Sequence, residues 1–434
     1  MITLNLFRVW LLLTQTTMNR FNAFFVIALV LAACSPQKPS LTLHRDIPYP
    51  ESTLIKRLVW EGQPAKYPGT GTDMHWWTLG IDGSLYVVDD DGANFGGPGW
   101  YAHVLKSTGV PPNHKVETVT DFQFYDFRKN LPDKLVRRYV CGAVAVDSNL
   151  YVSIYDYDWN IPGKPVNRDT LVKLLQQFHP WEQMSPPVRN QVGFIDGYSK
   201  IYGVAGIIQS KDFGKTWTNL PGKDTPEFFG NKFGAPAFLT FGPGNTQTPE
   251  ALGPYVYAIS NDVNWASGDN VFLGRVHRDS VIIRSAWQFY RGKTDAGEPL
   301  WTGEEKAASP VFSDPGHVGH PTITYNQALQ RYILCIASDM VPHREDSSPE
   351  ETRKWNWSSE MQLYESANPW GPWFIFHNET QWGGKDHTAY LPQMPANWLG
   401  KDGLTGSILF AGDYVNRKAE YYGFMTQLFR LELK

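Results

Sequence analysis

The sequence predicts an all-β fold, and among all-β architectures it favours a five-bladed β-propeller. Five segments share one pattern, in which a turn leads into an apolar strand that ends at a polar residue, often Asp; they span 83–91, 148–156, 253–262, 330–339 and 406–413. Variable spacing between such units is typical of propeller blades with loops of different lengths. Aromatic residues make up 14% of the 434 residues, which favours strands because aromatic side chains pack well on sheets. A pair of β-sandwiches is the alternative architecture.

The amino-terminal segment has the features of a bacterial lipoprotein signal. Met18–Cys34 carries a basic start, an apolar run too short to span a membrane comfortably, and small residues directly before Cys34. This predicts lipidation of Cys34 and translation that begins at Met18. Ser35 follows the cysteine, and by resemblance to enterobacterial sorting signals this indicates the outer membrane of a Gram-negative cell envelope. An uncleaved anchor within residues 1–34 is the alternative.

Beyond the signal, the chain is predicted to contain a tether and then a single domain. Residues 35–53 are polar and contain prolines, as expected of a link between a lipid and a folded unit. Residues 54–434 are predicted to form one propeller domain, which begins with a strand at Leu54–Trp60. One helix is expected at 168–178, where apolar residues recur at helical spacing inside an inserted loop.

Charge and cysteine content exclude several classes of function. The net charge of −4 gives no electrostatic footprint for nucleic acid. Cys34, Cys141 and Cys335 do not have the spacing of a zinc site. Cys141 and Cys335 lie in apolar, strand-like runs, so we expect two buried free thiols rather than a disulfide. The sequence contains no nucleotide- or dinucleotide-binding motif, and no cofactor is expected.

The stretch 72–97 is predicted to hold the centre of a functional site. Its two apolar runs flank a tight turn at Asp82-Gly83, which indicates a β-hairpin. Because antiparallel strands return the chain to its starting point, Asp73 and the triplet Asp89–Asp91 are expected at the same end. Glycoside hydrolysis needs two carboxyl groups, and Trp rings beside them would offer a sugar an apolar face. Asp73 and the Asp89–Asp91 cluster are therefore candidates for an acid/base pair.

Other interpretations of this end of the hairpin stay open. The Asp triplet would be a solvated strand end in a protein without a site here. Asp89, Asp91 and Asn94 could instead supply oxygens to a calcium ion. The Asp90 side chain is expected to face the other side of the strand, because side chains alternate along it.

Further polar and aromatic residues are candidates for contacts to a glycan. If the five patterned strands are innermost in their blades, Asp91, Asp156, Asp262, Asp339 and Asp413 converge on one central pocket. The substrate-binding candidates are His75, Trp76, Trp77, Asp156, Asn261, Asp262 and His320. A structural role is the alternative for each His, and at least one of the two Trp side chains is expected in the core.

Ser210–Trp217 reads S-x-D-x-G-x-T-W, the Asp-box found in sialidases and related propellers. In this motif the Asp caps the backbone amides of a hairpin turn, and the Gly takes a positive φ. The motif supports a propeller, and it predicts a structural role for Asp212.

Several segments, taken in order, resemble a bacterial family labelled as a domain of unknown function, whose characterised members include endo-D-arabinanases. These segments are Asp73–Trp76, Asp82–Tyr86, Asp91-Gly92, Phe95-Gly96, Gly206–Ile208, Phe233–Phe238, Val256-Tyr257, Ser260–Asp262, Gly274–Val276, Pro321–Tyr325, Arg331-Tyr332 and Pro369–Trp373. The resemblance covers nearly all of 54–434, and it implies a five-bladed propeller with catalytic roles for Asp73 and Asp91. The chain departs from the family pattern at Asp89–Gly92 and around 160–190, so specificity for D-arabinan is not implied.

These features together predict a lipid-anchored glycoside hydrolase that cleaves an extracellular or periplasmic polysaccharide. Resemblance to inverting propeller hydrolases implies inversion at the sugar carbon, although the sequence does not give the separation of the two carboxyl groups. An arabinofuranose polymer is one candidate substrate, and the membrane is a partner through the lipid. The alternative is a non-catalytic glycan-binding lipoprotein on the same scaffold, and a structural partner protein is the third possibility.

Overall fold

The structure is a computed structural model. It describes residues 47–92, 101–122, 136–158, 200–222, 225–262, 268–315, 317–342, 357–384, 387–412 and 420–434. All of these residues belong to the unit Leu43–Lys434. The predicted lipoprotein signal with Cys34 and the predicted helix at 168–178 lie outside the described residues.

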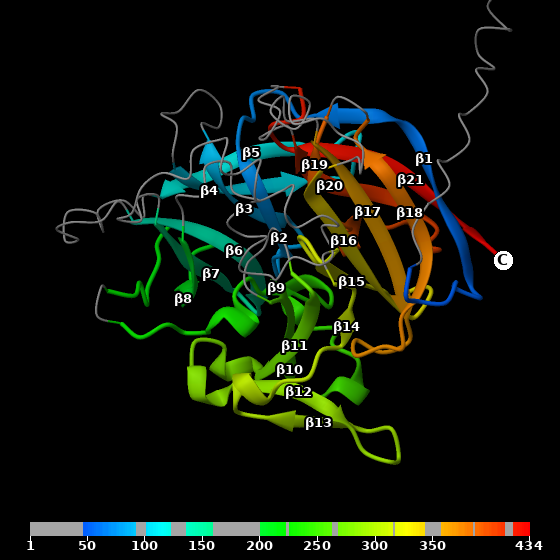
Figure 1. Cartoon of the computed structure of the whole chain (residues 1–434). Helices are drawn as coiled ribbons and strands as arrows, with labels where there is room; N and C mark the ends of the chain where they lie inside the picture. Colours follow the sequence, from blue (N-terminus) through cyan, green and yellow to red (C-terminus); the bar gives the residue numbers. More distant parts are fainter. Residues whose placement is uncertain are drawn as a thin grey trace, which may run out of the picture. The chain divides into compact units, whose positions relative to one another are not determined.

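The described residues form a five-bladed β-propeller, as the sequence predicts (Figure 1). Blade 1 consists of β2 (Asp73–Leu79), β3 (Leu85–Gly92), β4 (Tyr101–Thr108) and β5 (Lys115–Phe122). Blade 2 consists of β6 (Val136–Val146), β7 (Asn149–Asp158) and β8 (Lys200–Ser210). Blade 3 consists of β9 (Ala237–Phe238), β10 (Tyr255–Asn261), β11 (Asn270–His277), β12 (Gln288–Lys293), β13 (Pro299–Thr302) and β14 (Phe312–Ser313).

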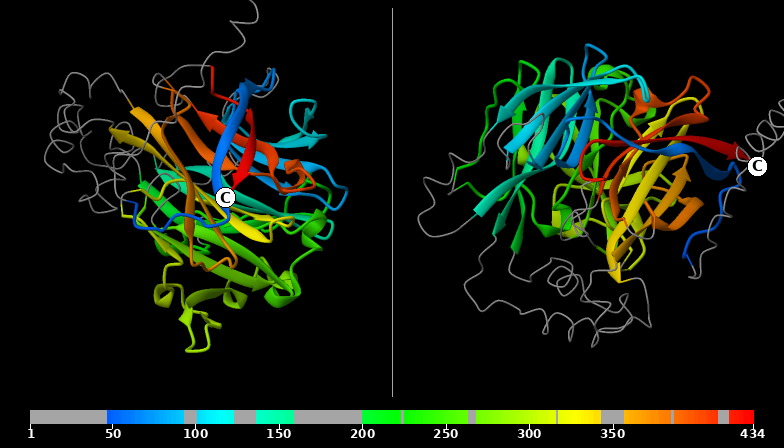
Figure 2. Two further views of the ribbon diagram at one scale, coloured as in Figure 1. Left: turned by 90° about the vertical axis from the view of Figure 1, so that its right-hand side faces the viewer. Right: turned by 90° about the horizontal axis from the view of Figure 1, so that it is seen from above.

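Blades 4 and 5 complete the ring. Blade 4 consists of β15 (Thr322–Asn326), β16 (Arg331–Pro342), β17 (Trp357–Ser366) and β18 (Phe374–Trp382). Blade 5 consists of β19 (Ala389–Gln393), β20 (Thr405–Gly412), β21 (Met425–Leu433) and β1 (Ile55–Lys66). Its outermost strand therefore comes from the start of the domain, and Figure 2 shows β1 beside β21. Pairing of the first and last strands closes the ring and protects an edge that would otherwise be open.

The five patterned segments of the sequence supply one strand to each blade, but that strand is the second one. They correspond to β3, β7, β10, β16 and β20, whereas β2, β6, β9, β15 and β19 are innermost. The expectation that the patterned strands line the axis is therefore wrong. The sequence predicts strands at β2 and at the Cys141 run of β6, but it does not mark β9 and β19, because β9 has two residues and β19 contains Pro392.

Each second strand runs antiparallel to the innermost strand of its blade, so it ends where the innermost strand begins. We call the side of the ring where the innermost strands begin the strand-start face. The hairpin turn at Asp82-Gly83 lies on the opposite face, since it joins the end of β2 to the start of β3. Gly83 has φ +77, a left-handed conformation that glycine adopts without strain.

Three apolar clusters fill the spaces between blades. The largest joins all five blades, the second lies between blades 4 and 5, and the third between blades 5 and 1. Cys141 and Cys335 are buried free thiols, which confirms the prediction from their apolar surroundings. Burial raises the pKa of both thiols and keeps them protonated.

Helical structure in the described residues is limited to single 3-10 turns. They are η4 (Asn231–Phe233), η5 (Pro243–Asn245), η6 (Glu250–Leu252), η7 (Arg278–Ser280), η8 (Arg284–Ala286), η9 (Glu305–Ala307) and η10 (Ala396–Trp398). None of the helices in this part of the chain has the length and apolar character needed to cross a bilayer.

The last residues of the segment predicted as a tether are packed on the propeller. The Tyr49 ring stacks on Phe312 at 4.4 Å, and its hydroxyl accepts a hydrogen bond from the Ser313 amide. Ser52 donates to Glu365 Oε1 at 2.8 Å, and Arg331 lies 2.9 Å from Glu365 Oε2. Any tether therefore ends before these residues, and Glu365 holds the start of the domain against blade 4.

The Asp-box forms the turn that the motif predicts. Asp212 Oδ1 accepts from the Thr216 amide at 2.8 Å, and Gly214 has φ +92. The tip packs on blade 1, where the Phe213 ring stacks on Tyr86 at 5.4 Å. The motif follows the end of β8, on the face opposite the start of β2, so Asp212 lies away from Asp73.

Ring closure by β1 predicts a large cost for truncating its buried face. Leu58 is buried opposite Leu431, and Leu58→Ala is expected to lower the free energy of unfolding by about 2–4 kcal/mol. Lys56→Ala, an exposed position on the same strand, is the control, with an expected change below about 0.5 kcal/mol. Urea denaturation measures both. Equal stability of the two variants would contradict a closing role for β1.

Candidate functional site

The opening hairpin brings its carboxylates together at the strand-start face. Asp73 begins β2, and its Cα is the register partner of Asp90 on β3. Asp73, Asp89 and Asp90 are 6%, 0% and 3% exposed. Asp91 follows on the same strand, but its side chain lies outside the described residues. The prediction that Asp73 and the Asp triplet share one end of the hairpin is confirmed.

Asp89 is the centre of a buried polar network. Its Oδ2 accepts a hydrogen bond from the Thr72 hydroxyl at 2.8 Å, and its Oδ1 lies 2.8 Å from His103 Nδ1. His75 Nε2 lies 2.9 Å from Thr72 Oγ1 and 3.6 Å from Asp89 Oδ2. We call Thr72, His75, Asp89 and His103 the Asp89 network. All four side chains are at most 1% exposed, so water does not compete for these bonds.

The network fixes the tautomer of His75. The Thr72 hydroxyl has one proton and gives it to Asp89, so it accepts from His75, whose Nε2 must carry a hydrogen. His75 Nδ1 then holds a lone pair, and no group in the described part of the chain bonds to it. Burial lowers the pKa of His75 to about 4, outweighing the attraction of the Asp89 charge. His75 is therefore neutral at physiological pH.

Asp90 faces the opposite side of β3, as the alternation of side chains predicts. Its Oδ2 accepts from the Val140 amide of β6 at 3.1 Å. The bond ties blade 1 to blade 2 near the axis, whereas the Asp89 network lies on the side where His75 contacts Phe424 of blade 5. The adjacent carboxylates Asp89 and Asp90 thus face the two opposite neighbours of blade 1, with Asp89 on the side of blade 5 and Asp90 bonded to blade 2.

Backbone strain lies next to Asp73. Met74 has φ +53, and this left-handed conformation costs an L-residue roughly 1–2 kcal/mol. The Asp73 side chain accepts from the Met74 amide at 2.7 Å, and Gln393 of β19 donates to the His75 carbonyl. Strain of this kind persists where surrounding bonds hold it, and it is common at active sites.

Other innermost strands show the same feature at equivalent positions. Gly142 in β6, Leu391 in β19 and His320, two residues before β15, also have positive φ. A Cβ on Gly142 would lie 2.0 Å from the Pro236 carbonyl oxygen, so only glycine fits there. The pairing of the innermost strand shifts register at this point in blades 1, 2 and 5.

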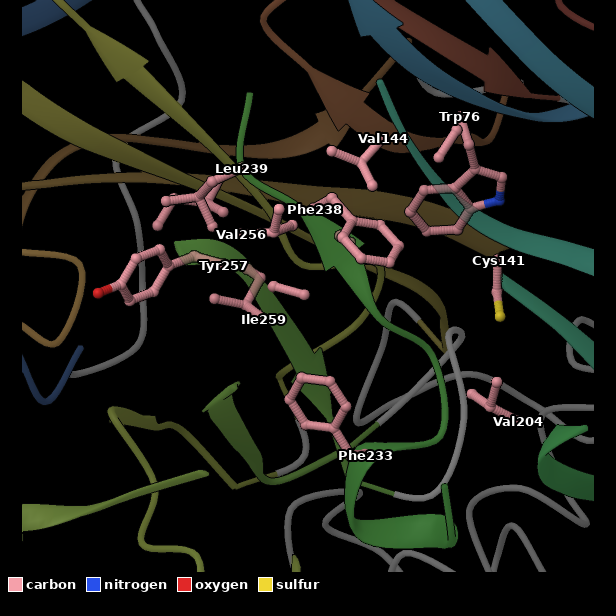
Figure 3. Packing of buried hydrophobic residues seen from close by; sticks show 14 of the residues in the cluster. Trp76, Cys141, Val144, Val204, Phe233, Phe238, Leu239, Val256, Tyr257 and Ile259 are labelled. Atoms are coloured by element: carbon pink, nitrogen blue, oxygen red, sulfur yellow. The ribbon is translucent and has the colours of Figure 1, made fainter. Parts of the chain in front are cut away.

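Trp76 and Trp77 fill the core in this structure. Trp76 lies among Val144 and Phe238 in the cluster that joins the blades (Figure 3). Trp77 packs with Leu105 and Phe424 in the cluster between blades 5 and 1. They are 3% and 7% exposed, so neither ring presents an open face to a sugar here.

The candidates from blades 3 and 4 are also enclosed or engaged. Asp262 Oδ1 accepts from the amides of Asp269 and Asn270, which is a turn-forming role. Asn261 is fully buried, and its Nδ2 donates to the Val318 carbonyl at 3.4 Å. His320 is also fully buried and stacks on Tyr390 at 5.6 Å. Burial lowers the His320 pKa to about 3 against a backbone hydrogen bond with Ala337 that raises it.

Several expectations rest on side chains that lie outside the described residues. These are the side chains of Asp156 in β7 and Asp339 in β16. Asp413 and Asn94 lie in segments between the described ranges. For calcium, both oxygens of Asp89 already receive hydrogen bonds from the protein. Within the described ranges, no group of three or more His, Cys, Asp or Glu side chains could hold a metal ion.

Thr72, His103 and Gln393 were not candidates from the sequence, although they complete the site. His103 had a signal, because it stands between Ala102 and Val104 in the apolar first half of its strand. A polar side chain at such a position needs a buried partner. Gln393 had no signal in the sequence, since its contact with the His75 carbonyl depends on the ring closing.

A family described as Domain of unknown function (DUF4185) matches residues 189–385 of this chain. The matched residues include blades 3 and 4 and leave out the opening hairpin with Asp73 and Asp91. No curated protein matches this chain.

Three solved glycosidase structures are distantly similar to this chain in backbone structure. A GH43_1 enzyme from Xanthomonas citri is 11% identical, with a TM-score of 0.40, over 85% of this chain and 90% of its own. RS223-Beta-xylosidase is 11% identical, with a TM-score of 0.44, over 85% and 95%. The alpha-L-arabinofuranosidase PaAbf62A from Podospora anserina is 9% identical, with a TM-score of 0.36, over 87% and 97%. Similarity of this extent carries no information on the activity of this chain.

The buried neutral histidines His75 and His320 predict a loss of stability on mild acidification. Their native pKa values of about 4 and about 3 lie below the ordinary value of 6.5. The unfolded chain therefore binds more protons between pH 6.5 and pH 4, and stability falls as the pH drops through that window. Each histidine is expected to lower the free energy of unfolding by about 2 kcal/mol between pH 8 and pH 5.

Urea denaturation at pH 8 and pH 5 measures this loss. His320→Gln removes one of these two histidines, so its stability should depend less steeply on pH than that of the unaltered chain. An unchanged pH dependence in His320→Gln would show that this histidine is not held neutral.

Proposed function

We propose that this chain is a glycoside hydrolase that cleaves a polysaccharide, with Asp73 and Asp91 as its acid/base pair. The observation that carries the proposal is the burial of three neighbouring carboxylates, Asp73, Asp89 and Asp90. They lie where β2 begins and β3 ends, at the strand-start face, and Asp91 follows them on β3. Buried carboxylates are costly unless paired or hydrogen-bonded, so a protein rarely gathers them for stability alone. Titratable groups gathered in this way are a mark of catalytic sites.

The chemistry requires two carboxyl groups that face each other across the glycosidic bond. One, as the carboxylic acid, gives its proton to the leaving oxygen as the bond to the sugar carbon breaks. The other, as the carboxylate, takes a proton from the water that attacks the same carbon from the opposite face. We expect this inverting arrangement, which needs a separation of roughly 6.5–9.5 Å between the carboxyl groups. Either Asp can hold either role.

The substrate we propose is an extracellular or periplasmic polysaccharide, and an arabinofuranose polymer is one candidate. Support comes from the resemblance of the opening hairpin and later segments to the family with endo-D-arabinanase members. The lipoprotein-like signal ending at Cys34 supports an anchor in the cell envelope, in the outer membrane of a Gram-negative cell.

A non-catalytic glycan-binding protein is the second candidate, and one observation favours it. His75, Trp76, Trp77, Asn261 and His320 are all buried, so the described residues near the axis offer packing rather than an open subsite. A propeller with a filled centre would bind a glycan through surface residues and cleave nothing.

Digestion of a polysaccharide panel by the detergent-purified full chain separates the two candidates. The panel includes D-arabinan and L-arabinan, and released oligosaccharides are measured by chromatography. Asp73→Asn and Asp91→Asn are each expected to lower the rate about 10²- to 10⁴-fold, because each removes a proton-transfer group.

Asp212→Asn is the matched control, since it removes a carboxylate from the Asp-box on the opposite face and should leave the rate unchanged. Activity that survives both substitutions in the hairpin would remove Asp73 and Asp91 from the chemistry. Binding to one polymer with no release from any would support the glycan-binding candidate.

A further inference from the structure

The carboxyl of Asp73 can act only if its short segment of backbone is held in place. Thr72 precedes it and His75 follows two residues later, and both are tied to Asp89 on the neighbouring strand. The Thr72 hydroxyl donates to Asp89 Oδ2 at 2.8 Å, and His75 Nε2–H donates to the same hydroxyl at 2.9 Å. The residues on both sides of Asp73 are thus connected through one oxygen atom.

Asp89 is itself fixed from a second direction. His103 on β4 lies 2.8 Å from Asp89 Oδ1, so the carboxylate is held between the first and third strands of blade 1. The entire Asp89 network is buried, and a carboxylate with hydrogen-bond donors on both oxygens has little freedom to rotate. The network is therefore a rigid reference point for the segment 72–75.

This segment needs external support because Met74 has a left-handed backbone. The regular ladder between β2 and β3 shifts register between Asp73 and Trp76, so backbone pairing does not hold the residues between them. The bond from Thr72 to Asp89, the bond from His75 to the Thr72 hydroxyl, and the bond from Gln393 to the His75 carbonyl replace it. The direction of the Asp73 side chain follows from this arrangement.

We propose that Thr72 is a positioning residue for Asp73, and that its hydroxyl, linking Asp89 to His75, fixes where the Asp73 carboxyl points. The inference rests on the proposed function, in which Asp73 takes part in the chemistry. It assigns no contact with the substrate to Thr72, which is fully buried.

Thr72→Val tests the hydroxyl without changing charge and with little change in shape. Asp89 Oδ2 then loses the Thr72 donor, and His75 Nε2–H is left 3.6 Å from that oxygen, so His75 is drawn toward Asp89 and the segment moves. Thr72→Ser keeps the hydroxyl and should restore most of the function.

Thr78→Val is the matched control. Thr78 is buried at the other end of the same strand, and its hydroxyl oxygen accepts from the Ala145 amide at 2.6 Å. Thr78→Val therefore removes a hydrogen bond of a threonine as buried as Thr72, but at a position away from Asp73.

Kinetics on the cleaved polymer are the first readout. In Thr72→Val, kcat is expected to fall about 10- to 100-fold, with KM within about threefold, because a misplaced catalytic group slows chemistry more than binding. Thr78→Val should keep kcat even where thermal unfolding shows a similar loss of stability. A normal kcat in Thr72→Val, or an equal loss in Thr78→Val, would overturn the proposal.

A second readout needs no substrate. Carbon-13 NMR of labelled aspartate carboxyls follows the titration of Asp73, whose signal is the one missing in Asp73→Asn. A new midpoint in Thr72→Val, but not in Thr72→Ser or Thr78→Val, is the expected result, since a moved carboxyl meets different neighbours. An unchanged midpoint would overturn the inference. A changed midpoint in a chain that cleaves no polymer would support the positioning role and contradict the proposed function.

Discussion

The pairing of β1 with β21 is the interaction on which the rest of the propeller depends. It places the start of the domain beside its end, with Leu58 opposite Leu431, and completes blade 5 from two distant parts of the chain. A closed ring has no free edge between first and last blade, and each blade is packed on two neighbours. Contacts that cross from blade 5 to blade 1, including the bond from Gln393 to the His75 carbonyl, exist only because the ring is closed.

Closure also determines what happens near the axis. Innermost strands that converge leave backbone groups unpaired, and buried groups of this kind need other partners. Side chains of neighbouring blades supply them: the Thr322 and Thr324 hydroxyls donate to the Pro392 and Met394 carbonyls, as Gln393 does to His75. The left-handed residue Met74 lies next to His75 and beside the carboxylate that we propose as catalytic. Geometry required for closing the ring thus also shapes the site.

The fold could be predicted from the sequence because it leaves local signals. The hairpin turn at Asp82-Gly83, the alternation that turns Asp90 away from Asp89, and the Asp-box at Ser210–Trp217 each depend on a few adjacent residues. The five second strands were found because they are long and apolar. The innermost strands β9 and β19 leave no such signal, because β9 has two residues and β19 contains a proline, and their pairing is decided by the blades around them.

The site was harder to predict for the same reason. Asp73 and the Asp triplet share a hairpin, so their proximity follows from chain geometry. The role of His103 depends on a third strand, and that of Gln393 on another blade, which no local pattern contains. Trp76 and Trp77 have the composition of a sugar platform, but the packing of blades on both sides of β2 places them in the core.

The most direct test of the account is a crystal structure of the Asp73→Asn variant with a bound oligosaccharide of the polymer that the chain cleaves. The account predicts a glycosidic bond held at the strand-start face, with a reacting oxygen within about 3–3.5 Å of the residue 73 side chain. An oligosaccharide bound elsewhere on the propeller, with residue 73 enclosed by protein, would contradict a catalytic role for Asp73.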